Sequence, residues 1–212
     1  TPSLDQQKRI VGILDQTFAD LEQACANTEQ NLKNACELFE SYLQQVVSQR
    51  GDGWAESTLG EEIELLTGFA FKSKEYVTDV NSIPLIRGDN IVQGKLRWVG
   101  VKLWPKNRVS EVEKYQLAVD DIVVAMDRTW VKAGMKYSKI TAADLPALLV
   151  QRVARIRCGN SLDADYLYHL VGSKLFEHYV LSIQTGLGVP HISGKQIQAF
   201  RFNKPSLEAQ KE

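Results

Sequence analysis

The chain has 212 residues, of which 44% are hydrophobic and 24% charged, with a formal net charge of −1. This is the composition of an ordinary globular protein and excludes a disordered or fibrous chain. No apolar run approaches ~20 residues and no signal-peptide pattern is present, so we expect neither a membrane span nor export. Cys25, Cys36 and Cys158 fit no zinc or disulfide pattern, which favours reduced thiols in a cytoplasmic protein.

A long helix is predicted from Leu4 to Ser48. The stretch has no proline and a single glycine, Gly12, and it is rich in Leu, Gln, Glu, Ala and Lys, which favour helices. Ser3 is a suitable N-cap because Gln6 follows three residues later, as in a capping box. The segment 50–51 (Arg-Gly) is the expected exit of this helix.

Apolar residues along this helix recur at the heptad spacing of a coiled coil. At 1.5 Å per residue the helix would be about 65 Å long, more than a small domain can cover, so we expect a partner helix. The alternative is a helix that packs only on its own domain. The predicted interface consists of Val11, Leu14, Phe18, Leu21, Leu32, Phe39, Tyr42 and Val46.

A separate globular domain is predicted to follow the Gly-Asp-Gly turn at 51–53. Short β-rich runs indicate strands at Pro84–Val92, Asp121–Met126 and Leu148–Arg157. One further helix is predicted over Asp163–Ile183, with Asp163 as its cap. The fold class is therefore α+β (mixed α/β), with a long coiled-coil-type helix at 1–50, a β-rich domain at 51–203 and the start of a second long helix at 204–212.

The two ends of the chain carry similar phrases, PSLDQQKRI at 2–10 and PSLEAQKE at 205–212. A phrase that returns after about two hundred residues indicates a repeated structural unit, of which one complete copy is visible. No Met opens the chain. We therefore expect a piece of a longer, internally repeated protein that ends where a second copy of the helix begins.

An ordered set of short motifs also runs through the whole chain. After the opening phrase come Trp54, Leu59-Gly60-Glu61, Thr67-Gly68, Phe71, Ile86–Ile91, Asp121-Ile122, Gln151-Arg152, Tyr166-Leu167, Thr185-Gly186 and His191–Ser193. Together with the repeated phrase, this order resembles the specificity subunit of a type I restriction–modification system. In that family two target-recognition domains are held apart by two antiparallel helices, which act as a ruler between two DNA half-sites.

The resemblance implies a non-catalytic DNA-specificity role. Residues 51–203 would be a target-recognition domain that reads one half of a bipartite duplex target. The chain would pair with a second copy, as a homodimer, or with a second half-subunit. Its other expected partners are an adenine-methyltransferase subunit, which would carry S-adenosylmethionine, and a translocating restriction subunit, while no cofactor or metal is expected on this chain.

Two segments of the predicted domain are basic although the whole chain is not. Residues 69–108 carry eight Lys/Arg against three acids, and residues 128–157 carry seven against one. Local potential steers a polyanion, and Arg, Lys and Asn can also read base edges. The predicted DNA-binding residues are Lys72, Lys74, Arg87, Asn90, Lys95, Arg97, Arg128, Thr129, Trp130, Lys132 and Lys195. The alternative for both segments is a set of solvated, basic strand edges.

Several of these residues have a structural alternative that the sequence leaves open. Arg87 and Asp89 can form a pair that orders a turn, and Asn90 can bond to nearby backbone. Trp130 can belong to the core or pack against a sugar or base. His191 is expected to be a hydrogen-bonded loop histidine.

A row of arginines is expected on one strand. Arg152, Arg155 and Arg157 alternate along the predicted strand Leu148–Arg157, so their side chains would share one face. That face would be solvated or would bind phosphate. The Gly-rich loop at 185–193 would allow close backbone approach of a ligand.

No catalytic pattern stands out in the sequence. The TGLGVP loop is neither a phosphate-cradling nor a dinucleotide motif, and His169 and His178 lie too far apart on one helix to ligate a metal together. Three hypotheses remain: a DNA-specificity module, a coiled-coil scaffold without DNA readout, and an enzyme with a helical arm. Steep salt dependence of duplex binding would separate the first from the second, and a pocket with a perturbed acid or base would favour the third.

Overall fold

The computed structural model describes residues 2–48, 54–79, 81–186 and 188–211. The chain divides into two compact units, residues 1–43 and 44–212. The predicted helix exit at 50–51, the Gly-Asp-Gly turn at 51–53 and the domain boundary between 50 and 51 lie outside the described residues. No helix among the described residues is long and apolar enough to cross a membrane.

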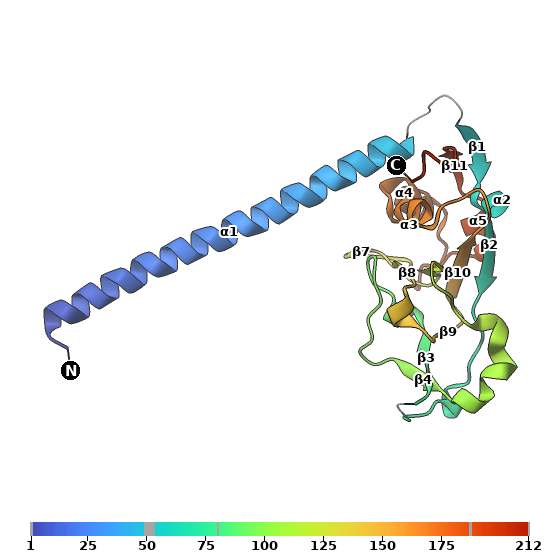
Figure 1. The fold of residues 1–212 in the computed structure, drawn as a ribbon, viewed down its shortest axis with the longest axis horizontal. Coiled ribbons are helices and arrows are strands. Elements are labelled where there is room, and N and C mark those ends of the chain that lie inside the picture. The colour runs from blue at the N-terminus through green and yellow to red at the C-terminus, as the bar shows by residue number, and fades with distance from the viewer. Residues whose placement is uncertain (1, 49–53, 80, 187, 212) are drawn as a thin grey trace. The chain divides into compact units, whose positions relative to one another are not determined.

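The first helix, α1 (Leu4–Ser48), is continuous and has the predicted bounds (Figure 1). Its capping box is also confirmed: the Ser3 backbone N–H donates to Gln6 Oε1 at 2.9 Å, and the Gln6 N–H donates to Ser3 Oγ at 3.4 Å. Val47 is its one fully buried residue among those described, and it belongs to the second unit.

The face of α1 away from the heptad seam is polar and repeats with the same spacing. Three side-chain amides each donate to an oxygen four residues on, with N···O distances of 2.7–2.9 Å, and the three pairs are seven residues apart. Such pairs stabilise an exposed helix surface by a few tenths of a kcal/mol each. The pairs are Gln16–Asp20, Gln23–Asn27 and Gln30–Asn34.

The second unit is built from short strands with helices beside them. Its elements are β1 (Ala55–Thr58), α2 (Leu59–Glu62), β2 (Ile63–Thr67), β3 (Ile83–Ile86), β4 (Lys102–Trp104), β5 (Ile122–Ala125), β6 (Trp130–Val131), β7 (Gly134–Met135), β8 (Tyr137–Lys139), β9 (Leu148–Leu149), β10 (Val153–Cys158), α3 (Ala164–Gly172), α4 (Lys174–Ile183), α5 (Gly194–Gln198) and β11 (Arg201–Lys204). Among the described residues of this unit, four 3₁₀ segments join them, at Ser73–Glu75, Gly88–Asn90, Lys106–Tyr115 and Ala142–Asp144. The predicted α+β class is confirmed.

Two sheets form the centre of this unit. The antiparallel sheet has the order β2-β10-β5-β8, and the smaller mixed sheet has the order β4-β3-β9, in which β3 and β9 run parallel. Strands β1 and β11, from opposite ends of the unit, pair beside each other (Figure 1). The fully buried side chains include Ile86, Ile91, Val123, Leu149 and Val153, which come from both sheets and the loops between them.

Two predicted elements are interrupted in the structure. The strand expected over Leu148–Arg157 is split into β9 and β10 by a turn in which Arg152 has φ = 68°. The helix expected over Asp163–Ile183 is split into α3 and α4. Asp163 caps α3 as predicted, but Ser173 starts a new helix by accepting the N–H of Phe176.

The tail of the chain forms one turn over residues 207–210, after β11. The Gln210 N–H donates to Ser206 O at 3.0 Å, and Gln210 Oε1 accepts the Asp163 N–H at 2.8 Å. The buried Gln210 therefore ties this turn to the start of α3. The second long helix expected at 204–212 stays a prediction.

Candidate nucleic-acid interface

A cavity of about 450 Å³ lies where several of the predicted DNA-binding segments meet. Its lining comes from five parts of the chain: the loop after β2, the Arg87 turn, the hairpin that carries β6 and β7, the turn between β9 and β10, and the Gly-rich loop. We call it the basic cavity. It is lined by Phe71, Tyr76, Arg87, Gly88, Asp89, Asp127, Arg128, Lys136, Val150, Gln151, Arg152 and Val189.

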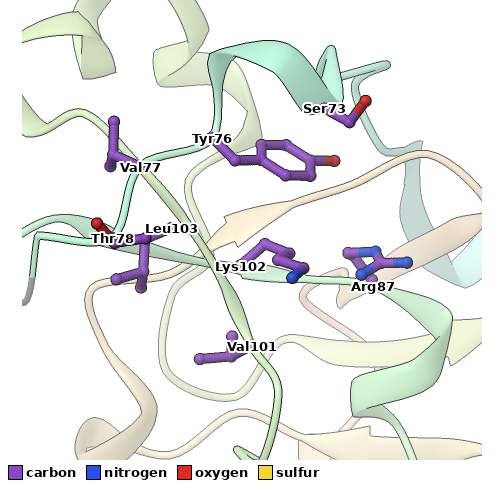
Figure 2. Close-up of a pocket in the computed structure, with 8 residues that line it drawn as sticks. All are labelled: Ser73, Tyr76, Val77, Thr78, Arg87, Val101, Lys102 and Leu103. Atoms are coloured by element: carbon purple, nitrogen blue, oxygen red, sulfur yellow. The ribbon is translucent and has the colours of Figure 1, made fainter.

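A second cavity, of about 650 Å³, adjoins the first because Tyr76 and Arg87 line both. Figure 2 shows the amino group of Lys102 and the guanidinium of Arg87 on one side of it, below the Tyr76 ring. Val101 and Leu103 supply its apolar wall. A polar and cationic surface thus continues from one cavity to the next.

The charges at the basic cavity do not cancel. Arg87 Nη2 lies 3.1 Å from Asp89 Oδ2, and Arg152 Nε lies 3.6 Å from Asp127 Oδ2. Within the described part of the chain, Arg128 and the half-buried Lys136 have no ion-pair partner. Burial is the main cause that lowers the pKa of Lys136, and the nearby Arg128 lowers it further, while Asp89 and Asp127 oppose the shift.

The backbone around this cavity is held by long-range hydrogen bonds. Arg128 has φ = 47°, and its N–H donates to Pro190 O at 2.7 Å, which joins it to the Gly-rich loop. The Met126 N–H donates to Arg152 O at 2.8 Å, which joins β5 to the turn between β9 and β10. The lining residues are therefore positioned by the sheets, although most of them lie in loops.

Two predicted DNA-binding residues are buried and support the loops instead. Asn90 is 2% exposed; its Nδ2 donates to Arg97 O at 3.1 Å, and its Oδ1 accepts the Arg87 N–H at 3.3 Å. Thr129 is 1% exposed, and its hydroxyl donates to Met126 O at 3.1 Å. This corrects the sequence-based expectation for these two side chains, because groups enclosed in this way present no surface to DNA.

The other predicted residues lie on the surface but not all at one place. Arg87 and Arg128 line the basic cavity, and Arg97 is tied to the same turn because its Nη2 donates to Asp89 O at 2.8 Å. Lys195 lies on α5 and lines neither cavity. The exposed residues of the set are Lys72, Lys74, Lys95, Arg97, Arg128, Lys132 and Lys195.

Trp130 and His191 have mainly structural contacts. Trp130 Nε1–H donates to Glu177 Oε1 at 3.0 Å, which fastens strand β6 to α4, and its ring stays partly exposed. The His191 ring lies 3.2 Å from Thr185 Oγ1 and 3.3 Å from Val189 O, so it is a hydrogen-bonded loop histidine as predicted.

The predicted arginine row is wrong for Arg152, while Arg155 and Arg157, two residues apart on β10, do share a face. Arg152 lies in the turn before β10, Arg155 is buried and pairs with Glu64, and Arg157 donates through Nε and Nη2 to the buried Asp121 at 2.7 and 2.9 Å. Arg155 and Arg157 are therefore occupied by carboxylates of the sheet. Only Arg152 reaches the basic cavity.

The cavity residues that the predicted DNA-binding set leaves out include Lys102, Lys136 and Gln151. Lys136 ends the basic run that begins at Arg128, and that position was the available signal. Its role depends on the hairpin fold, since the Lys136 N–H donates to Thr129 O at 2.8 Å and so closes the hairpin beside Arg128.

The heptad seam of α1 forms a second candidate surface. Its residues are exposed within the first unit, with values of 47–67% for Val11, Leu14, Phe18, Leu21 and Leu32. Phe39 and Tyr42 are also exposed, and Val46 is half-buried. A row of large apolar side chains at this spacing is typical of a helix that packs against another helix.

Comparison with known proteins agrees with this geometry. Residues 51–212 match the family described as the type I restriction modification DNA specificity domain. The chain belongs to this family. The predicted family and its DNA-specificity class are therefore confirmed.

Named specificity subunits show how much of a relative's length this chain matches. The chain is 38% identical to the EcoAI specificity subunit of Escherichia coli over 154 residues, 71% of this chain and 25% of that protein. It is 25% identical to the MjaVIII specificity subunit of Methanocaldococcus jannaschii over 99% of this chain and 52% of that protein. It thus spans a quarter to a half of these relatives.

Solved structures show the same fold. The chain superposes on 49% of the HsdS subunit from Thermoanaerobacter tengcongensis with a TM-score of 0.65, 18% identity and 99% coverage of this chain. A chain from a structure of type I R-M system assembly gives a TM-score of 0.70 at 18% identity, over 99% of this chain and 50% of that chain.

Proposed function

We propose that this chain is a DNA-specificity half-subunit whose domain reads one half of a bipartite duplex target. The observation that carries the proposal is that one cavity is lined by Arg87, Arg128, Lys136 and Arg152. These residues lie in loops that connect different strands. Loops and hairpins can enter the major groove of DNA, where the edges of the nucleobases are distinguishable. Cations at the foot of such a hairpin can at the same time bind the phosphates of the DNA backbone.

The rest of the assembly is part of the same proposal. The α1 seam would pack against the corresponding helix of a second copy or of a second half-subunit, and the helix pair would set the spacing of the two half-sites. An adenine-methyltransferase subunit would dock on the complex and bring S-adenosylmethionine, so this chain would direct chemistry without performing it. A translocating restriction subunit is a further proposed partner, and the site of action is the cytoplasm.

The test is to co-express the chain with the methyltransferase subunit encoded beside its source gene. The complex is purified, its mass is measured, and methylated adenines are mapped on plasmid DNA. We expect a stable complex that methylates one short bipartite sequence. A complex that forms but binds all duplexes equally would favour the scaffold hypothesis instead.

Charge reversals in the same assay locate the interface. Arg87→Glu and Arg128→Glu should each abolish methylation at the target by weakening DNA binding, since each adds a repulsive charge beside the phosphates. Lys106→Glu is the matched control because Lys106 is exposed, basic and outside both cavities. If all three variants methylate the target as well as the wild-type chain does, the DNA interface lies elsewhere.

A further inference from the structure

The basic cavity contains two cations that form no direct ion pair with a carboxylate of the described residues. Of its four basic residues, Arg87 and Arg152 have acidic neighbours at 3.1 and 3.6 Å. Arg128 and Lys136 have neither an ion pair nor a side-chain hydrogen bond among the described residues. Two cations without an ion-pair partner therefore line one open cavity.

Lys136 is confined as well as unpaired. Its residue is half-buried, and its Nζ lies against the turn at Gly88, where an added Cβ would be 3.8 Å away. A partly desolvated ammonium without a counter-ion is costly, and an anion placed beside it would recover that cost. Lys136 thus differs from the exposed Lys72, Lys74 and Lys95, which water already solvates.

Two hairpins lie next to the cavity, and the residues at their tips occupy different positions from those at the foot of the hairpin. Lys95 lies in the turn between Ile91 and Leu96, and Lys132 lies in the turn between β6 and β7. Both are exposed, and Gln93 Nε2 joins the two hairpins by donating to Gly134 O at 3.2 Å. Arg128 and Lys136 lie at the base of the second hairpin, in the concave part of the surface.

This arrangement distinguishes base readout from backbone binding. Base edges lie inside the DNA groove and can be reached only by projecting groups, whereas phosphates stand at the rim and fit a recess. We propose that Arg128 and Lys136 together bind a single backbone phosphate of duplex DNA in the basic cavity. This rests on the proposed function and adds that the contact is independent of sequence, with readout assigned to the hairpin tips.

Asp89 and Asp127 neutralise two of the four cations that line the cavity. They pair with Arg87 and Arg152, so Arg128 and Lys136 are the two cations that remain without an ion-pair partner among the described residues. A guanidinium can donate two parallel hydrogen bonds to a phosphate, and the lysine adds a point charge. A single tetrahedral phosphodiester anion therefore suits the pair better than a flat base.

The experiment measures binding of the full chain to a labelled duplex containing the mapped target across a range of salt concentrations. Each phosphate contact contributes about −0.9 to the slope of log K against log salt in B-DNA. Arg128→Met and Lys136→Met should each lower the magnitude of the slope. Because the two share one phosphate, the double variant should lower it by about 1 and not by about 2.

Controls separate the possible failures. Lys106→Met should leave the slope unchanged. Lys136→Arg should keep most of the wild-type slope, because it keeps the positive charge. Circular dichroism should show that all variants are folded. Binding to a single-base-substituted duplex should fall by the same factor in wild type and variants. If the double variant has an unchanged slope, or if its base preference changes, the phosphate assignment is wrong. The proposed function would still stand in that case, provided that the wild-type chain binds the target. Absence of wild-type binding would overturn both.

Discussion

Glu62 shows how one buried carboxylate holds together distant parts of the domain. It is 8% exposed and accepts hydrogen bonds from the hydroxyls of Ser57 and Ser161, and from Lys204 Nζ at 2.6 Å. The partners belong to β1, the loop before α3, and β11. Since β1 and β11 close the domain, this cluster stabilises the region where its two ends meet.

The charge of Glu62 predicts a pH dependence of stability. Burial raises the pKa of Glu62, but the bonds from Lys204, Ser161 and Ser57 outweigh it, and the pKa lies below its usual value of 4.5. A carboxyl with a lowered pKa in the folded state stabilises the fold above its unfolded pKa and loses this effect as pH falls through the folded pKa. Wild type should therefore lose stability below about pH 4.5.

Glu62→Gln isolates this contribution. The variant should be less stable by about 1–3 kcal/mol at pH 7, because a charged acceptor is lost beside Lys204. Its free energy of unfolding should change less than that of wild type between neutral pH and pH 3, measured by urea denaturation. Glu113→Gln, at an exposed position, is the control. Parallel curves for Glu62→Gln and wild type would contradict the assignment.

Individual side-chain partners were the part of the site hardest to predict from sequence. Arg157 meets Asp121 36 residues away, and Arg155 meets Glu64 91 residues away, so no local pattern signals either pair. Asn90 shows the opposite case: its bonds are local, at separations of three and seven residues, and the bonding of Asn90 to nearby backbone was among the sequence-based alternatives. Hydrogen bonds between residues close in sequence could be predicted. The strand register that brings distant residues together could not.

At the scale of elements, the turn between β9 and β10 depends on Gly68. The Gly68 N–H donates to Val153 O at 3.0 Å, and a Cβ at this position would lie 2.2 Å from Val150 O and 2.8 Å from Gln151 N. The backbone of this turn therefore fits only against a glycine. Because Gln151 and Arg152 line the basic cavity, Gly68 also positions part of the proposed interface.

Gly68→Ala should accordingly damage both stability and binding. Forcing a methyl group into packed backbone costs about 1–3 kcal/mol, and the turn must shift to admit it. We expect a lower urea midpoint together with weaker duplex binding. Gly12→Ala is the control, because nothing lies within 4 Å of its added Cβ and alanine favours a helix. A Gly68→Ala variant with unchanged stability would show that the turn adapts easily.

The elements that sequence predicted best were those with a strong local signal. The α1 helix keeps its predicted bounds because heptad spacing, helix-forming residues and the Ser3 cap agree over 45 residues. The helix expected over Asp163–Ile183 breaks at Ser173, whose backbone is extended and whose hydroxyl accepts the Phe176 N–H. A local serine cap thus sets a boundary that apolar periodicity alone extends through.

At the scale of the whole molecule, the exposed α1 seam is the surface that we expect to mediate assembly. Phe18 and Leu32 are 59% and 67% exposed and lie on the predicted seam, two heptads apart. Full burial of such a side chain stabilises association by about 1.5–3 kcal/mol. The opposite face carries the amide pairs of Gln23 and Gln30, which are satisfied within the helix and do not require a partner.

We therefore predict that Phe18→Glu combined with Leu32→Glu converts a self-associating chain into a monomer. Loss of both contacts, with charge added at the seam, should weaken the dimer at least about 100-fold, since ~2.7 kcal/mol corresponds to that factor. Sedimentation velocity over a range of concentrations measures the change. Gln23→Glu with Gln30→Glu adds the same charge on the other face and should leave association intact. If both double variants behave alike, the seam does not mediate pairing; if wild type is monomeric throughout, the partner helix must come from a different chain, and a bipartite target would then require two unlike half-subunits.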